Sequence, residues 1–204
     1  MKKYFKWIIM IICLVIFIIT SVMVYTGKDM LIDSYLYEFI SKYFISDNMT
    51  MVVKGITFFG DVLGILIAFI ISLIVFRNKK INICIISNLI IVSILNYLLK
   101  IIFMRERPNI NPLVVENTYS FPSGHSMVSM AFYGYLIYLI YNHINNRVVK
   151  YLFIGILSIL IFLIGISRVY LGVHYTSDVI GGFCFSIAYL IIFIYFSKKV
   201  IKKI

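Results

Sequence analysis

Residues 7–25, with the sequence WIIMIICLVIFIITSVMVY, contain no Lys, Arg, Asp or Glu. An α-helix needs about 20 apolar residues to cross the hydrocarbon core of a bilayer. Similar runs follow, and the six candidate spans are residues 7–25, 56–76, 81–99, 125–141, 151–166 and 179–197. Their apolar residues are continuous rather than alternating, which argues against transmembrane β-strands. The sequence therefore predicts an all-α, polytopic membrane bundle of six transmembrane helices, in which the short fourth and fifth runs borrow flanking residues.

The composition of the whole chain agrees with this prediction. Of the 204 residues, 62% are hydrophobic and 13% are charged, whereas soluble domains have about 45–50% and about 25%. These values exclude a soluble globular domain, a disordered chain and a disulfide-stapled secreted scaffold. No linker of biased composition divides the chain, so we expect residues 1–204 to form a single membrane domain.

The formal net charge of +11 is unevenly distributed. Twelve of the 19 basic residues, and none of the 8 acidic ones, lie before the first span, between the second and third, between the fourth and fifth, and after the sixth. An even number of spans puts these segments on one side, which the positive-inside rule assigns to the cytoplasm. Both termini are then cytoplasmic, and the basic charge requires no nucleic-acid partner.

Residues 29–48, between the first and second spans, have a different pattern. Apolar side chains recur there at spacings of three and four among charged ones: Ile32, Tyr35, Leu36, Phe39, Ile40 and Tyr43. This periodicity predicts an amphipathic helix lying in the outer membrane interface. An ordinary loop packed on the bundle is the alternative.

Polar and charged residues gather at the ends of spans on the predicted outer face, in residues 100–108, 120–126 and 167–178. Ionisable groups at membrane depth are costly and therefore indicate function. Lys100 and Arg107 are seven residues apart, which on a continuous helix is about two turns and places both on one side. Anchoring of the span in the interface is the alternative for these cations.

The second of these segments has the features of a helix start. Ser123 is a favourable N-cap, and Gly124 lets the backbone come close to a ligand. The free N–H groups and dipole of a helix N-terminus favour an anion such as phosphate. His125 would lie in the first turn, where it could deliver a proton. A capped helix with a hydrogen-bonded histidine is the alternative.

In the third segment, His174 and Asp178 are four residues apart and can touch across one helical turn. A carboxylate bound to one ring nitrogen fixes the tautomer and leaves the lone pair of the other nitrogen free. Such a histidine suits a nucleophile, a general base or a metal ligand. With Arg168 nearby, the three segments supply three cations, a helix N-terminus, two histidines and a carboxylate, which is the set that phosphoryl transfer requires.

At these residues the sequence resembles the type 2 phosphatidic acid phosphatase superfamily of membrane phosphatases. The three motifs of that family, K-x6-R-P, P-S-G-H and S-R-x5-H-x3-D, occur in order between Lys100 and Asp178 without a departure. The resemblance covers the third to sixth spans, whereas residues 1–55 carry no motif.

The resemblance implies a role for each motif residue. His174 would be the nucleophile that forms a phosphohistidine, Asp178 would orient and charge-stabilise it, and His125 would protonate the leaving oxygen. The implied phosphate-binding residues are Lys100, Arg107, Ser123, Gly124 and Arg168. The family implies no metal and no other cofactor.

The resemblance also implies an enzyme integral to the bacterial cytoplasmic membrane, with an outward-facing site and with the bilayer and a lipid phosphate as partners. Undecaprenyl diphosphate, hydrolysed to undecaprenyl phosphate, is the first expected substrate. Phosphatidylglycerophosphate or phosphatidic acid is the second. Two other classes stay open, namely a non-hydrolytic lipid binder or transporter and a metal-dependent hydrolase.

Three further charged residues near the motifs receive no functional role from the sequence. Asp61 is expected to be a satisfied polar group in the interface, and Arg105 and Glu106 are expected to be solvated loop charges. The alternatives are that Asp61 pairs with a basic residue of the site and that Arg105 or Glu106 contacts a lipid head group.

Overall fold

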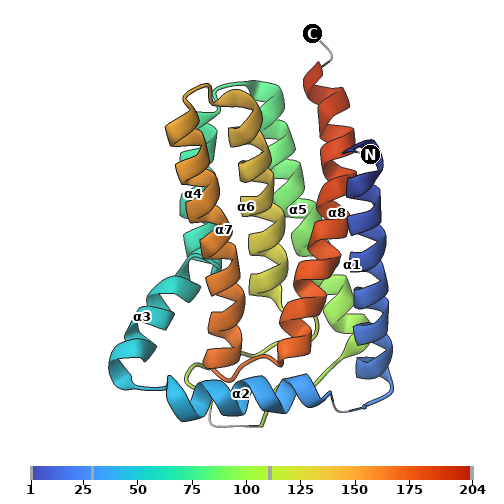
Figure 1. Ribbon diagram of the computed structural model, residues 1–204, viewed down its shortest axis with the longest axis vertical. Coiled ribbons are helices and arrows are strands. Elements are labelled where there is room, and N and C mark those ends of the chain that lie inside the picture. The colour runs from blue at the N-terminus through green and yellow to red at the C-terminus, as the bar shows by residue number, and fades with distance from the viewer. Residues whose placement is uncertain (1, 29, 110–111, 203–204) are drawn as a thin grey trace.

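The computed structural model describes residues 2–28, 30–109 and 112–202, and within these ranges it contains eight α-helices and no strand (Figure 1). The helices are α1 (Lys2–Tyr25), α2 (Leu31–Tyr43), α3 (Asp47–Phe58), α4 (Val62–Val75), α5 (Lys79–Phe103), α6 (Gly124–His143), α7 (Arg147–Tyr170) and α8 (Thr176–Lys202). The prediction of an all-α fold is confirmed.

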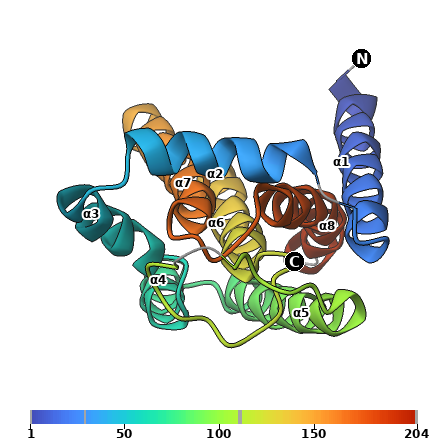
Figure 2. The same cartoon turned by 90° about the horizontal axis from the view of Figure 1, so that it is seen from below.

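The long helices stand side by side, and α2 crosses one end of the bundle (Figure 1). The central helix is α6, which packs against α5, α7 and α8, while α1 packs against α8. Seen from that end, α2 passes across α7 and α8, beside the connections that follow α5 and α7 (Figure 2). These connections and the helix ends next to them contain the motif residues, so the fold gathers the predicted site at the end of the bundle that α2 covers.

The core lies where α6 meets its neighbours. Its completely or almost completely buried side chains include Ile85 of α5, Phe132, Tyr133 and Leu139 of α6, and Ile164 of α7. The Tyr133 hydroxyl donates a hydrogen bond of 2.7 Å to the carbonyl of Phe59, which satisfies a polar group at membrane depth. A central helix therefore tolerates polar atoms that a lipid-facing helix would not.

Four helices, α1, α5, α7 and α8, are long and apolar enough to cross a membrane, and α3 with α4 would make a fifth span. The protein is thus an integral membrane protein. Helix α7 extends beyond the predicted run 151–166 at both ends, as expected. The count of six spans, which needs α6 as well, stays a prediction.

The predicted span 56–76 is not one continuous helix, because α3 and α4 are bent by 50° at the break between them. A turn ends α3, in which the backbone N–H of Gly60 donates to Thr57 O and that of Asp61 donates to Phe58 O. A Cβ atom at Gly64 would lie only 2.0 Å from the carbonyl oxygen of Phe58. The bend therefore depends on glycine at position 64.

The predicted helix 29–48 is also wrong in its boundaries, since α2 ends at Tyr43 and a second helix, α3, starts at Asp47. The hydroxyl of Ser46 caps α3 by accepting a hydrogen bond from the backbone N–H of Met49. Ile40 of α2 is buried against α7, whereas Tyr35 is exposed. Residue 29 lies outside the described residues, and the interfacial location of α2 stays a prediction.

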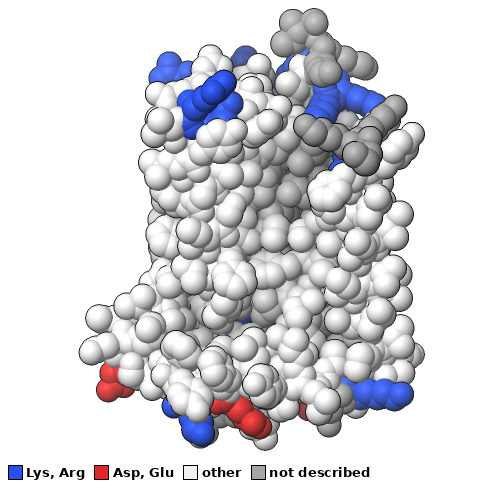
Figure 3. Space-filling view, in the orientation of Figure 1, with Lys and Arg blue, Asp and Glu red and all other residues white. Residues whose placement is uncertain are grey.

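The charged side chains are distributed as the sequence suggests. On the face shown in Figure 3, only Lys and Arg are visible at the end that holds both termini, while Asp and Glu appear at the end with α2. Lys203, one of the predicted cytoplasmic cations, lies outside the described residues. The basic segments share one end of the bundle, but their cytoplasmic side stays a prediction.

The bend predicts opposite effects for two glycine substitutions. Gly64→Ala should lower the unfolding temperature in detergent, since overpacking costs about 1–3 kcal/mol. Gly155→Ala in α7 is the matched control, because no described atom beyond its chain neighbours and the adjacent backbone of α7 lies within 4 Å of its Cβ position and Ala favours a helix by about 1 kcal/mol. Equal unfolding temperatures for the two variants would contradict the role of Gly64.

Candidate active site

A cavity of about 560 Å³ opens between α4 and α5 and reaches the predicted site. Five of the predicted site residues line it, namely Lys100, Arg107, Gly124, His125 and His174. The other three, Ser123, Arg168 and Asp178, are buried. Asp178 contacts His174, Arg168 contacts Glu116 of the cavity wall, and Ser123 directly precedes Gly124 and contacts Ser126. The structure therefore brings all three motifs together at one place.

The spacing of Lys100 and Arg107 would place them on one side of a continuous helix, but the two residues do not share a helix. Helix α5 ends at Phe103, because Met104 adopts a left-handed conformation with φ of 43°. Arg107 is instead held in the following loop, where Nε and Nη1 donate hydrogen bonds of 2.7 Å to the carbonyls of Thr118 and Val173. Lys100 Nζ donates to the carbonyl of Tyr119, so backbone oxygens fix both cations.

The start of α6 agrees with the prediction. Ser123 is the N-cap and its hydroxyl accepts from the backbone N–H of Ser126. A Cβ atom at Gly124 would lie 3.9 Å from Lys100 Cε, so the backbone passes close to this cation. His125 lies in the first turn, and its Nε2 is 2.6 Å from Asp61 Oδ1. The expectation that Asp61 is only an interfacial group is therefore wrong, and the alternative of pairing with a basic residue is correct.

His174 lies in the short connection before α8 and is 3% exposed. Its Nδ1 is 3.3 Å from Asp178 Oδ2 and 3.2 Å from the hydroxyl of Ser120. The Ser120 hydroxyl itself donates to Asp178. In the tautomer with a proton on Nδ1, the ring donates to the carboxylate and keeps a lone pair on Nε2. The cation of Arg107 lies beside that nitrogen, with its Nη1 3.2 Å away.

Arg168 is almost completely buried at the end of α7. Its Nη1 donates a hydrogen bond of 2.7 Å to the hydroxyl of Thr57 in α3, and its Nη2 donates to Glu116. The other carboxylate oxygen of Glu116 is 3.6 Å from Arg107 Nη2. A single carboxylate therefore bridges two of the three cations that the sequence assigns to phosphate binding.

With this geometry in place, comparisons with known proteins identify the family. The model of the PAP2 superfamily, the type 2 phosphatidic acid phosphatases, matches residues 81–202. The chain belongs to the PAP2 superfamily. Phosphatidylglycerophosphatase B of Bacillus subtilis (strain 168) is 38% identical over 111 residues, which are 52% of this chain and 53% of that protein. The matched region thus spans about half the length of this curated PAP2 relative.

Two solved structures are similar to most of this chain. The crystal structure of a transmembrane PAP2-type phosphatidylglycerolphosphate phosphatase from Bacillus subtilis has a TM-score of 0.81 at 29% identity, covering 95% of this chain and 98% of its own. The crystal structure of Aquifex aeolicus LpxE has a TM-score of 0.64 at 25% identity, covering 84% and 97%.

Arg105 is a residue of this PAP2 site that the sequence analysis missed. It is not a solvated loop charge, because its guanidinium donates to Asp178 Oδ1 at 2.6 Å and to Asp33 Oδ2 at 2.9 Å. The sequence contained a signal for a partner of Asp33 in the protein interior. Asp33 lies seven residues, or two helical turns, before Ile40, and both side chains are on the buried side of α2. A charge on the buried side of an amphipathic helix requires a partner. Glu106, in contrast, is exposed as expected.

Burial sets the protonation state of His174. The pKa of this ring is lowered to about 3, first because burial disfavours the imidazolium and further because Arg107 and Arg168 oppose it, although Asp178 favours it. The ring is therefore neutral near pH 7 in the folded protein. Since the unfolded chain has the ordinary histidine pKa of about 6.5, folding at lower pH requires loss of a proton.

This difference predicts how stability depends on pH. The contribution of His174 is fully present above about pH 6.5 and is lost as the pH falls towards about 3. We expect the unfolding temperature in detergent to fall between about pH 7 and about pH 5, and to fall less steeply in His174→Gln, which cannot titrate. Equal slopes in the two proteins would assign the pH dependence to other groups.

Proposed function

We propose that this PAP2 protein is a membrane lipid phosphatase that transfers a phosphoryl group to His174 and then to water. The observation that carries the proposal is the state of His174, whose Nδ1 lies beside Asp178 while its Nε2 faces the Arg107 cation in the cavity. A neutral imidazole oriented by a carboxylate is an activated nucleophile. A protein that only binds a lipid phosphate would need the cations but not this oriented ring.

The proposed reaction has two steps. In the first, Nε2 of His174 attacks the phosphorus, the bond between phosphorus and the lipid oxygen breaks, and His125 gives its proton to that oxygen. In the second, His125 takes a proton from a water molecule, whose oxygen attacks the phosphorus and breaks its bond to His174. Asp61 Oδ1, 2.6 Å from Nε2 of His125, orients this ring and stabilises its protonated form, which exists before the first step and again after the second.

The phosphoryl oxygens would be bound by Lys100, Arg107 and Arg168 together with the start of α6. Fixed cations and backbone N–H groups stabilise the charge on the equatorial oxygens of the transition state. Ser123 takes part as the N-cap that begins α6, and Gly124 as the residue whose backbone comes close to Lys100. None of these steps requires a metal ion.

The apolar part of the cavity favours a lipid substrate. Val62, Ile65 and Leu66 of α4 line it together with Leu89 of α5, next to the cations. A lipid could keep its chain between these helices while its phosphate reaches His174. The activities in the names of the two Bacillus subtilis proteins favour phosphatidylglycerophosphate as the substrate. Undecaprenyl diphosphate and phosphatidic acid are the other candidates within the same proposal.

The proposal includes an orientation in the membrane. Residues 1–204 form one domain of six spans, both termini are cytoplasmic, and the site faces outward with α2 in the outer interface. The shared position of both termini and the basic side chains at the end opposite α2 supports this arrangement (Figures 1 and 3). The site would then meet substrates at the extracytoplasmic surface.

Phosphate release tests the function directly. Purified protein in detergent should release phosphate from one or more of phosphatidylglycerophosphate, undecaprenyl diphosphate and phosphatidic acid, with full activity in excess EDTA. His174→Asn should lose more than about 10³-fold in kcat, because no other group forms the intermediate. Wild-type protein that binds these lipids without releasing phosphate would favour the binder, and loss of activity in EDTA would favour the metal-dependent hydrolase.

Asp61 offers a second test. Asp61→Asn removes the carboxylate that faces His125 and should lower kcat about tenfold to a hundredfold, with a smaller change in KM because Asp61 does not bind the phosphate. Asp47→Asn is the matched control, since Asp47 is exposed at the start of α3. If both variants had wild-type kcat, Asp61 would have no part in the proton transfers.

A further inference from the structure

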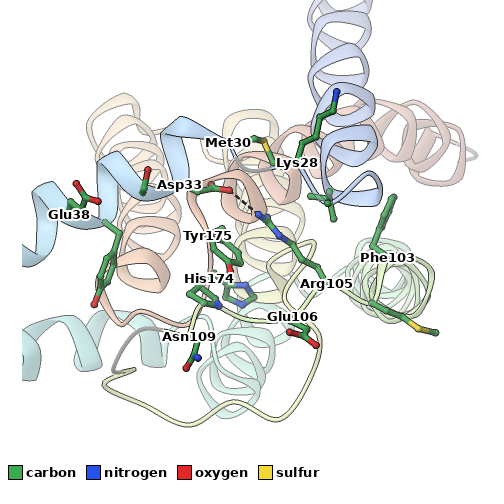
Figure 4. A pocket seen from close by; sticks show the side chains of 16 residues that line it. Lys28, Met30, Asp33, Glu38, Phe103, Arg105, Glu106, Asn109, His174 and Tyr175 are labelled. Carbon is green, nitrogen blue, oxygen red and sulfur yellow. Dashed lines mark hydrogen bonds and ion pairs between the residues drawn. The ribbon is translucent and has the colours of Figure 1, made fainter.

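Arg105 lies in a second cavity, of about 700 Å³, under α2, and His174 lines this cavity as well (Figure 4). The side chain of Arg105 is enclosed by charged and aromatic groups. Nη1 is 2.6 Å from Asp178 Oδ1, Nη2 is 2.9 Å from Asp33 Oδ2, and Cζ lies 3.9 Å from the centre of the Tyr175 ring. A guanidinium with a carboxylate on each side and a ring beneath has a fixed orientation.

Asp33 connects this arginine with the start of α8. Its Oδ1 accepts a hydrogen bond of 2.7 Å from the backbone N–H of Ser177, and its Oδ2 accepts one of 2.8 Å from the Ser177 hydroxyl. An acidic side chain at a helix N-terminus satisfies a free N–H group and interacts favourably with the helix dipole. Helix α2 therefore caps α8 in the turn that contains Asp178.

The two oxygens of Asp178 have different partners. Oδ2 faces Nδ1 of His174 and accepts from Ser120 and from the backbone N–H of Tyr175, whereas Oδ1 accepts from Arg105. Asp178 is completely buried. A buried carboxylate without a cation is strongly unfavourable, and it would recruit a proton or an imidazolium. Arg105 supplies this cation, and so His174 need not be protonated to compensate Asp178.

We propose that Arg105, held in place by Asp33, is a positioning residue that fixes Asp178 beside His174 and supplies the positive charge that Asp178 would otherwise draw from the ring. The inference rests on the proposed function, in which neutral His174 is the nucleophile. It adds to the motif residues a pair from α2 and from the loop after α5.

The surroundings of His174 give the sign of the expected effect. Besides Arg105, the charged or titratable groups in the cavity that His174 shares with α4 and α5, or acting on its ring, are Asp61, Lys100, Arg107, Glu116, His125, Arg168 and Asp178. Of these, Asp178 favours the protonated ring, while Arg107 and Arg168 disfavour it. Without the charge of Arg105, Asp178 acts on the ring uncompensated, and the pKa of His174 rises.

Kinetics of four variants test the positioning role. Arg105→Gln should lower kcat by about 10²-fold, the effect of a small misplacement of a reacting group, and should move the acid limb of the kcat profile to higher pH. Arg105→Lys should restore part of the kcat and part of the pH shift. Asp33→Asn should lower kcat and shift the acid limb in the same direction, but by less. Lys28→Gln, which removes a cation whose side chain points away from Arg105 in the same cavity, should behave as wild type (Figure 4).

A readout without substrate separates this inference from the proposed function. Titration of 15N-labelled histidines by NMR, with the His174 signals assigned by their loss in His174→Asn, should give a higher pKa of that ring in Arg105→Gln than in wild type. An unchanged pKa together with unchanged kcat in an active enzyme would overturn the inference and leave the function standing. If wild type releases no phosphate, the function fails, and the titration alone decides on Arg105. Should Arg105→Gln not fold, Asp33→Asn is compared instead.

Discussion

The site depends on one constraint, which is the need to compensate a carboxylate that has no contact with water. Asp178 is completely buried, and an uncompensated charge at such a place costs several kcal/mol. Hydrogen bonds from Ser120 and from the backbone of Tyr175, and the guanidinium of Arg105, meet that need from the connections after α5 and before α8, and Asp33 of α2 in turn holds Arg105. The connection after α5, the connection before α8 and helix α2 are thereby brought together, and His174 is placed where they meet.

The helices supply the rigidity that this arrangement requires. The central helix α6 packs on three others, and its N-terminus carries His125. The bend between α3 and α4 moves Asp61 into contact with this histidine, and a Cβ atom at Gly60 would lie only 2.8 Å from the His125 ring. The same bend leaves the cavity between α4 and α5. On the proposed function, one distortion of an apolar segment thus serves both proton transfer and access from the lipid.

Much of the fold and the contact between motif residues follows from local patterns. Apolar runs predict the long helices, Ser123 predicts the start of α6, and the spacing of His174 and Asp178 predicts their contact. Hydropathy does not detect the bend, because a close approach of backbone at Gly64 causes it.

The end of α5 at Phe103 has no local signal either, since no proline precedes position 108 and the residue with positive φ, Met104, is not a glycine. The role of Arg105 was missed because both of its partners are more than 70 residues away in sequence. For Arg105 the decisive contacts are therefore long-range. Only the charge of Asp33 on the buried side of α2 left a trace in the local pattern.

Glu116 would compete with a substrate phosphate for the arginines of this site. Because its carboxylate already pairs with Arg168 and approaches Arg107, a phosphate that binds these arginines replaces one anion by another. The measured affinity is then a difference between two ion pairs, and charge alone contributes little to it. A lipid adds the burial of its chain between α4 and α5, whereas free phosphate has no such term. On the proposed function, Glu116 thus makes product inhibition weak and leaves selection of the substrate to its apolar part.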